Sequence, residues 1–197
     1  SIINNTFEGL FRYEGKKIAP AIAESYDLSS DGLTYTIKLK NTKWSDGSPL
    51  TASDFEYAWK RALDPKTASE YAYQLYYIKG GRDFNSGTGT RDAVAVKALD
   101  DETLQVVLEA PTSYFLDLLT YFTYMPTKKS VVEASKDGKW AIDPKQIVSN
   151  GPFVLSEYLS GDKIVLVKNQ NYWQADAVSL DRIHGFMIVD EYTMLTA

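Results

Sequence analysis

The sequence predicts a mixed α/β fold, in which short antiparallel strands and short helices follow one another along the chain. Three observations lead to this prediction. Residues 33–40 alternate apolar and polar side chains, the period of a half-buried strand. Residues 51–63 carry apolar side chains at helical spacing behind a capping motif. Hairpin patterns at residues 96–108 and 153–168 indicate that antiparallel pairing recurs.

A tight turn leads into the helix predicted at residues 51–63. Asp46-Gly47 is a turn pair, because Gly accepts a positive φ and Asp bonds its own backbone. Thr51 can cap the helix, since Asp54 stands three residues later in the capping-box position. Pro65 ends it, because the residue before a proline avoids the α region. The predicted buried face consists of Phe55, Ala58, Trp59 and Ala62.

The remaining elements follow from the same kinds of signal. Further helices are predicted at residues 4–10, 67–78, 112–119 (with Thr112 as the cap) and 128–135, and further strands at 21–28 and 182–189. Residues 82–91 are rich in Gly, Ser, Thr and Asn without periodicity, which predicts a surface loop. Residues 190–197 have the pattern of a helix start without a C-cap.

The composition limits the classes of function. The chain has 197 residues, 44% of them hydrophobic, enough for one or two domains with a core. Its net charge of -5, with both signs interspersed, argues against nucleic acid and anionic membrane surfaces as partners. It has no Cys, which excludes disulfides, thiol catalysis and Cys-based zinc sites. No apolar run approaches the length of a membrane span.

Few side chains suggest catalysis or metal binding. His184 is the only histidine, so a catalytic triad or a two-histidine metal site would need carboxylates for its other members. The acidic pairs lie in turns or at predicted helix starts, where acids are favoured; they are Asp100-Asp101, Asp190-Glu191, and Asp117 with Glu109. The glycines at 80, 81, 87 and 89 lack the Lys-Ser/Thr of a phosphate loop. We therefore expect no catalytic residue, no metal and no cofactor.

Several phrases of the sequence resemble the oligopeptide- and dipeptide-binding proteins of ABC importers. Residues 29–36 have the sequence Ser-Ser-Asp-Gly-Leu-Thr-Tyr-Thr, and residues 44–55 Trp-Ser-Asp-Gly-Ser-Pro-Leu-Thr-Ala-Ser-Asp-Phe. Phe-Glu-Gly-Leu at residues 7–10 and Lys-Asn-Gln-Asn-Tyr-Trp at residues 168–173 resemble further family phrases, although Gln170 replaces a proline in the second. The resemblance covers essentially the whole chain.

The resemblance implies a periplasmic-binding-protein-like fold of type II, cluster C. It also implies that the chain is a fragment, less than half of a full-length member. Residues 1–6 would begin the first lobe, residues 7–130 would form the small α+β second lobe, and residues 131–197 would belong to a truncated first lobe that binds ligand. The whole third lobe is then missing.

The function implied by the resemblance is ligand capture without catalysis. Such a protein is the extracytoplasmic solute-binding component of an ABC transporter; it captures oligopeptides in a cleft between lobes and delivers them to the permease subunits. We expect a monomer at the bacterial cell surface or in the periplasm. It would contact the membrane only through the permease or through a lipid anchor upstream of Ser1.

Other functions stay open. The same fold can be tuned to a dipeptide, a nickel complex or a signalling peptide. A hydrolase and a surface interaction module are alternatives from other classes. The lack of Cys, the single His and the absence of a Gly-x-Ser-x-Gly turn count against a hydrolase.

Tyr71 is the one ligand-binding residue that the resemblance implies. It ends the phrase Asp-Pro-x-Thr-Ala-Ser-x-Tyr, in which the family's tyrosine reaches the cleft and hydrogen-bonds the bound peptide. A phenol is apolar enough for a closed cleft and its hydroxyl can donate or accept. Glu70 stands where relatives often have proline. On a regular helix Tyr73 would lie roughly 200° around from Tyr71, and we expect it not to share the contact. The alternative is that Tyr71 only packs.

Overall fold

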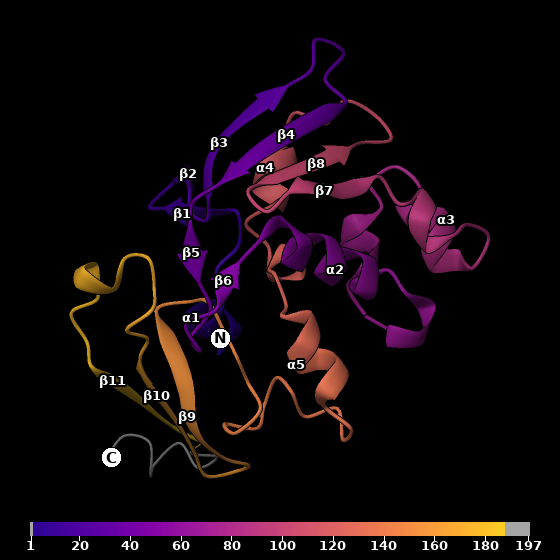
Figure 1. Ribbon diagram of the computed structural model, residues 1–197. Helices are drawn as coiled ribbons and strands as arrows, with labels where there is room; N and C mark the ends of the chain where they lie inside the picture. The colour runs from indigo at the N-terminus through magenta and orange to yellow at the C-terminus, as the bar shows by residue number, and fades with distance from the viewer. Residues whose placement is uncertain (1, 188–197) are drawn as a thin grey trace.

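The computed structural model describes residues 2–187 (Figure 1). Within that range the strands form four antiparallel sheets. The largest has the strand order β3-β4-β8-β7, with β3 at Ala23–Leu28, β4 at Thr34–Leu39, β7 at Val96–Asp100 and β8 at Thr103–Val107. The helix α2 (Ala52–Ala62) packs against β7 and β8 of this sheet. Strands and helices are therefore mixed, as the sequence predicts.

The other three sheets are smaller. They are β1 (Phe11–Glu14) with β2 (Lys17–Pro20), β5 (Thr42–Lys43) with β6 (Pro49–Leu50), and β11-β10-β9, which comprises β9 (Phe153–Leu159), β10 (Lys163–Lys168) and β11 (Arg182–Phe186). The remaining α-helices are α1 (Ile3–Thr6), α3 (Gly81–Ser86), α4 (Phe115–Leu118) and α5 (Lys129–Ala134). Short 3₁₀ helices are η1 (Pro65–Thr67), η2 (Ala72–Leu75), η3 (Arg91–Ala93), η4 (Phe122–Tyr124) and η5 (Ala175–Ala177). None of the helices in residues 2–187 has the length and apolar composition needed to cross a bilayer.

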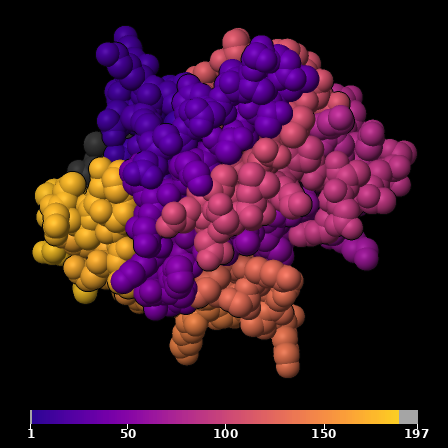
Figure 2. Space-filling view, turned by 45° about the horizontal axis from the view of Figure 1, so that its top comes forward, coloured from indigo at the N-terminus to yellow at the C-terminus, as the bar shows by residue number. Residues whose placement is uncertain are grey.

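Buried side chains form a large cluster and a small one. The large cluster lies between α2 and the four-stranded sheet and draws its members from residues 7–124. The small cluster lies on the three-stranded sheet and consists of Phe153, Leu155 and Leu166. The space-filling view shows the yellow C-terminal segment against the indigo-to-purple part of the chain, on the opposite side from the magenta helical segment (Figure 2).

The hairpin of β3 and β4 forms where the sequence predicts it. Tyr35, Ile37 and Leu39 are buried at every second position of β4. Gly32 takes a φ of 72° in the connecting turn, a conformation that favours glycine. The carboxylate of Asp31 accepts a hydrogen bond from the amide of Leu33 at 3.0 Å, which closes the turn. Local signals therefore define this part of the sheet.

The helix α2 begins and ends as predicted. Thr51 is its N-cap, and the amide of Thr51 donates to the carboxylate of Asp54 at 2.9 Å, which is one half of the capping box. Phe55 and Trp59 on the predicted face are fully buried. The indole of Trp59 donates to the carbonyl of Tyr124 at 2.8 Å, so its single polar group is satisfied inside the core.

The cap gives a first testable expectation. Thr51→Ala removes a side-chain oxygen at the N-cap and should lower the free energy of unfolding by about 1 kcal/mol. Thr51→Ser keeps that oxygen and should leave stability unchanged. Urea unfolding curves of the three proteins measure the effect. An alanine variant with the wild-type midpoint would show that the side-chain oxygen of Thr51 adds nothing to the bond between its amide and Asp54.

Three predictions about smaller elements are wrong. The N-terminal helix stops at Thr6, because Phe7 is already extended with φ -122° and ψ 155°. The predicted surface loop at residues 82–91 instead contains most of α3 and the start of η3. Thr112 does not cap α4, which starts after Tyr114; the hydroxyl of Thr112 donates to the carbonyl of Ala110.

The second helix, predicted at residues 67–78, is also wrong. The chain there forms η1 and η2 with a break between them. At the break Ala68 takes a φ of 50°, in the left-handed region that interrupts any right-handed helix. This departure decides the placement of the tyrosines in the same segment.

The last predicted strand is confirmed for its described part, as β11, where His184 lies. Residues 188 and 189 of that prediction, and the helix start predicted at residues 190–197, fall outside the described residues.

Candidate functional site

Tyr71 lies at the N-cap of η2, directly after the break in the backbone. Upstream, the carboxylate of Asp64 accepts from the amide of Lys66 at 2.9 Å and fixes the start of η1 at Pro65. Tyr71 itself has φ -106° and ψ 15°, which is not a regular helical conformation. Its side chain is 41% exposed. An irregular backbone therefore presents the phenol at the surface, as is common for binding residues.

Tyr71 is part of a row of four exposed aromatic rings, which we call the aromatic ladder: Tyr73, Tyr71, Phe122 and Tyr121. The Tyr71 ring centroid lies 5.2 Å from that of Phe122, at an interplanar angle of 80°, and 6.2 Å from that of Tyr73. Phe122 continues the row to Tyr121 at 5.3 Å. The four side chains are between 36% and 52% exposed. Such a row offers a large, rigid and amphipathic surface.

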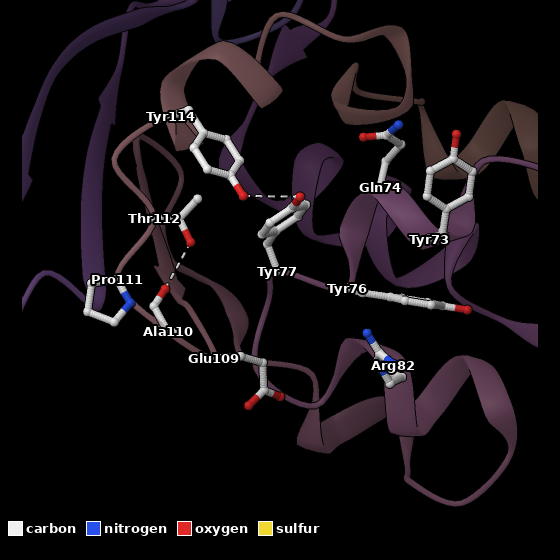
Figure 3. A pocket seen from close by; sticks show the side chains of 10 residues that line it. All are labelled: Tyr73, Gln74, Tyr76, Tyr77, Arg82, Glu109, Ala110, Pro111, Thr112 and Tyr114. Carbon is white, nitrogen blue, oxygen red and sulfur yellow. Dashed lines mark hydrogen bonds between the residues drawn. The ribbon is translucent and has the colours of Figure 1, made fainter.

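The hydroxyl of Tyr71 makes no hydrogen bond to another group in residues 2–187. Tyr77 and Tyr114 differ in this respect, because their hydroxyls hydrogen-bond to each other at 3.3 Å (Figure 3). A phenol without a partner at the surface is bonded to water and can exchange that water for a ligand group. Tyr71 therefore has the exposure and the unused hydrogen-bonding group that a ligand contact needs.

Tyr73 does not lie where a regular helix would place it. The sequence-based expectation puts it on the opposite side from Tyr71, as an independent control. That expectation is wrong, because the segment is not an α-helix and the two rings are in contact. A change at Tyr73 would also disturb the surroundings of Tyr71.

A cavity of about 700 Å³ lies beside the aromatic ladder (Figure 3). Tyr73 lines both the cavity and the ladder, whereas Tyr71 does not line the cavity. Its two charged side chains have partners within the fold: Arg82 lies over the ring of Tyr76 at 5.2 Å, and Glu109 accepts from the amide of Gly80 at 2.8 Å. We therefore place the candidate site at the ladder.

The other groups singled out in the sequence lie apart from the ladder. His184 is exposed on β11, and its ring stacks on that of Phe186. Asp100 is the last residue of β7, where hydrogen bonds from the hydroxyl of Thr103 and the amide of Glu102 lower its pKa. Asp117 accepts from the hydroxyl of Tyr13 at 2.6 Å. Within residues 2–187 no group of three or more His, Asp or Glu is arranged to hold a metal ion, and Asp190-Glu191 lie outside that range.

The four glycines considered for a phosphate loop have structural surroundings. Gly80 has a φ of 76° at the start of α3, and a Cβ there would lie 2.5 Å from the carbonyl oxygen of Ala93. A Cβ at Gly81 or Gly89 would likewise meet backbone atoms at 3.0 Å or less. Gly87 ends α3 with a φ of 80°. Tight packing and turn geometry therefore explain these glycines.

The structure brings together two motif phrases whose contact sequence reasoning missed. The buried carboxylate of Glu8 accepts hydrogen bonds from Arg12 at 2.7 Å, from the hydroxyl of Tyr172 at 3.0 Å and from the indole of Trp173 at 2.5 Å. Burial, followed by the negative charge of Glu8, raises the pKa of Tyr172 well above its ordinary value. The side-chain amide of Asn150 holds the backbone of Glu8 on both sides, at 3.1 and 2.9 Å. Both phrases resemble the family, but nothing in either one indicates its partner.

Comparison with known proteins places the chain in a family. Residues 17–197 match the model of the bacterial extracellular solute-binding proteins, family 5. The chain is 46% identical to the oligopeptide-binding protein OppA of Bacillus subtilis over 98% of its length, and 44% identical to the dipeptide-binding protein DppE of the same organism over 97%. It superposes on the structure of Listeria monocytogenes OppA bound to peptide with a TM-score of 0.95 at 38% identity, over 99% of this chain and 39% of that one.

The chain belongs to the bacterial extracellular solute-binding proteins, family 5. It spans 36% of the length of OppA and 35% of that of DppE. The periplasmic-binding-protein-like fold expected from the sequence is confirmed by the superposition.

Proposed function

We propose that the protein containing this chain is the solute-binding component of an ABC importer, which captures oligopeptides and delivers them to a membrane permease. Family membership and the similarity to proteins named for oligopeptide binding support this proposal. The function is binding alone, and it needs no cofactor. The permease subunits are its protein partners, and it acts as a monomer outside the cytoplasm, either lipid-anchored at the cell surface or in the periplasm.

The aromatic ladder, with the unpartnered hydroxyl of Tyr71, is the observation that carries the proposal. An extended peptide has backbone donors and acceptors at regular intervals, and a surface phenol can bond them whatever the side chains are. Aromatic faces next to that phenol give apolar contact at little conformational cost. Closure of a second wall over the ladder would bury the peptide.

The proposed lobes follow the two clusters of buried side chains. The fully buried members of the large cluster lie in residues 7–124, which supports a small α+β lobe at residues 7–130; Trp140, Ile147, Val148 and Trp173 pack against this cluster from the other proposed lobe. The small cluster on the three-stranded sheet supports the assignment of residues 131–197, together with 1–6, to the first lobe. The ladder would then be the wall that the second lobe contributes to the cleft.

A dipeptide is the second candidate ligand class. The identity to the dipeptide-binding protein DppE is 44%, against 46% to OppA, so overall similarity does not separate the two. Affinities for an unmodified dipeptide and for a pentapeptide, measured on one preparation of the full-length protein, distinguish them. Tighter binding of the pentapeptide supports the oligopeptide assignment, and tighter binding of the dipeptide overturns it.

Tyr71→Phe in the full-length protein tests the site. The change deletes one hydroxyl and keeps the ring, so affinity should fall by about 0.5–1.5 kcal/mol, or up to roughly tenfold. The loss should be similar for three peptides of unrelated sequence, because a backbone contact does not distinguish side chains. Calorimetric titration measures the affinities, with an unfolding curve for each variant.

Tyr26→Phe is the matched control for this experiment. Tyr26 is 42% exposed, close to the 41% of Tyr71, and it lies on β3 against Phe11 and Tyr35, outside the ladder. Its loss of a hydroxyl should leave peptide affinity unchanged. If Tyr71→Phe binds all three peptides as tightly as Tyr26→Phe does, Tyr71 only packs.

A further inference from the structure

Cationic side chains from three separate elements gather around one tyrosine on the outer side of α2. Tyr57 follows the buried Phe55 by two positions, so it lies roughly 200° around the helix from that core residue. The guanidinium of Arg91, on η3, lies 5.9 Å from the centroid of the Tyr57 ring, and the ammonium of Lys129, on α5, lies 6.0 Å from it. Arg61 follows Tyr57 by one turn of α2. We call Tyr57, Arg61, Arg91 and Lys129 the cationic cluster.

The cationic cluster has more positive charge than the carboxylate next to it balances. A carboxylate oxygen of Glu133 lies 3.9 Å from the ammonium of Lys129, and both side chains are more than half exposed. The guanidinium groups of Arg61 and Arg91 form no ion pair and no hydrogen bond within residues 2–187. Asp92, the neighbour of Arg91 in the sequence, lines a cavity to which no member of the cluster belongs. Three positive charges therefore face one negative charge, in a chain whose net charge is -5.

The hydroxyl of Tyr57 adds an unused hydrogen-bonding group to the cluster. It has no hydrogen-bond partner in the part of the chain that the structure describes. Burial, followed by the charge of Glu133, raises the pKa of Tyr57 above its ordinary value. The charges of Arg61 and Arg91 oppose this rise. Both guanidinium groups therefore lie within electrostatic reach of the hydroxyl.

Another arginine–tyrosine pair shows what a purely structural contact looks like in this fold. Arg82 lies over the ring of Tyr76 at 5.2 Å, and the hydroxyl of Tyr76 donates to the side chain of Asn85 at 2.6 Å. In that pair the phenol has a partner within the fold. In the cationic cluster the phenol has none, and cations from three elements gather at one ring, so stacking alone does not account for the arrangement.

We propose that the cationic cluster binds a phosphate group. A guanidinium presents its N–H donors in a planar fork that matches phosphate oxygens, and a lysine adds a mobile point charge. A phosphate group carries a charge of about −1.5 to −2 at pH 7, which complements the local excess of positive charge. The hydroxyl of Tyr57 can donate to a further oxygen. No member of the cluster belongs to the aromatic ladder, so this site is separate from the proposed peptide contact and does not depend on it.

Calorimetric titration of the full-length protein with inorganic phosphate, at constant ionic strength, tests the proposal. The double variant Arg61→Gln/Arg91→Gln should bind phosphate about tenfold or more weakly than wild type, because it loses charge-assisted hydrogen bonds. Glu133→Gln should bind phosphate more tightly than wild type, since it removes the negative charge beside the site. This gain would not be expected if the cluster only stabilised the fold.

The matched pair of single variants is Arg91→Gln and Arg82→Gln. Each removes one positive charge from above a tyrosine ring, but only Arg91→Gln should weaken phosphate binding. This pair also carries the test if the double variant does not fold, because Arg61 stacks on Trp140 at 5.4 Å and its loss disturbs that contact. An unfolding curve for each variant verifies the fold.

Vesicles distinguish the two sources of a phosphate group. Vesicles of phosphatidylcholine are prepared with and without phosphatidic acid, and sedimentation measures the bound protein. Binding that needs phosphatidic acid and is lost in Arg91→Gln assigns the site to a lipid headgroup, whereas phosphate binding without sedimentation assigns it to a soluble phosphate.

Three results would overturn the proposal: a wild-type protein that binds neither inorganic phosphate nor the phosphatidic acid vesicles, equal phosphate affinity in Arg91→Gln and Arg82→Gln, or weaker phosphate binding in Glu133→Gln than in wild type. Peptide affinity should be the same in wild type and in Arg91→Gln. Failure of the phosphate site therefore leaves the proposed function intact, and loss of peptide binding in wild type contradicts only the proposed function.

Discussion

Gly151→Ala should destabilise the chain by about 3 kcal/mol, at the upper end of what overpacking costs. A Cβ at this position would lie 2.6 Å from the carbonyl carbon of Thr6 and 2.8 Å from the amide nitrogen of Phe7. Both are backbone atoms, which cannot rotate away as the end of a side chain can. The amide of Gly151 also bonds the carbonyl of Thr6, so relief of the clash breaks that bond. Urea unfolding measures the loss.

Gly185→Ala is the control for this change. Gly185 lies on β11, and a Cβ there meets nothing within 4 Å. Its replacement should therefore leave the unfolding midpoint where it is. Similar midpoints for the two alanine variants would show that the close approach of residues 6–7 to residue 151 is absent in solution.

Glu8→Ala is the second large effect, expected at about 3 kcal/mol. The change removes a buried carboxylate that accepts from Arg12, Tyr172 and Trp173. The hydroxyl of Tyr172 still accepts from Arg12 but loses the group to which it donates, and the indole of Trp173 loses its acceptor. A buried donor that is left without an acceptor destabilises the folded state by its full desolvation penalty.

Glu14→Ala separates this network from a simple ion pair. Glu14 bonds the same guanidinium at the same distance, 2.7 Å, but its side chain is 57% exposed against 8% for Glu8. An exposed ion pair contributes about 0–1 kcal/mol. Equal losses of stability in the two variants would contradict the role assigned to Glu8.

The parts of the fold that the sequence predicts well are those with complete local signals. The β3–β4 hairpin has alternating side chains on one strand and Gly32 in its turn. The helix α2 has a cap at Thr51, an apolar face and a stop at Pro65. In both cases the turn or cap residues and the apolar face predict the same element, and tertiary packing does not change the backbone that they favour.

The wrong predictions lie where packing decides the backbone. Residues 67–78 have the composition of a helix, but Ala68 adopts a left-handed conformation for which alanine has no preference. Residues 82–91 have the composition of a loop, yet α3 occupies Gly81–Ser86. Its start packs so closely that a Cβ at Gly80 or Gly81 would strike the carbonyl of Ala93 or of Leu75. Neither cause is visible within a short window of sequence.

The candidate site shows the same limit. The family resemblance singles out Tyr71, but the ring that supports it belongs to Phe122, in a different element. The Glu8 network joins residues more than 160 positions apart. Such contacts follow from the folded arrangement, and a single sequence holds no local pattern that indicates them.

The central claim is that the full-length protein captures peptides and releases them unchanged. The most direct measurement is to incubate it with a defined peptide mixture, wash away the unbound fraction, release the bound species by denaturation and determine their masses. The account predicts intact peptides in stoichiometric amount. Cleaved peptides would make the protein an enzyme, and an empty bound fraction would make it an interaction module; either result contradicts the account.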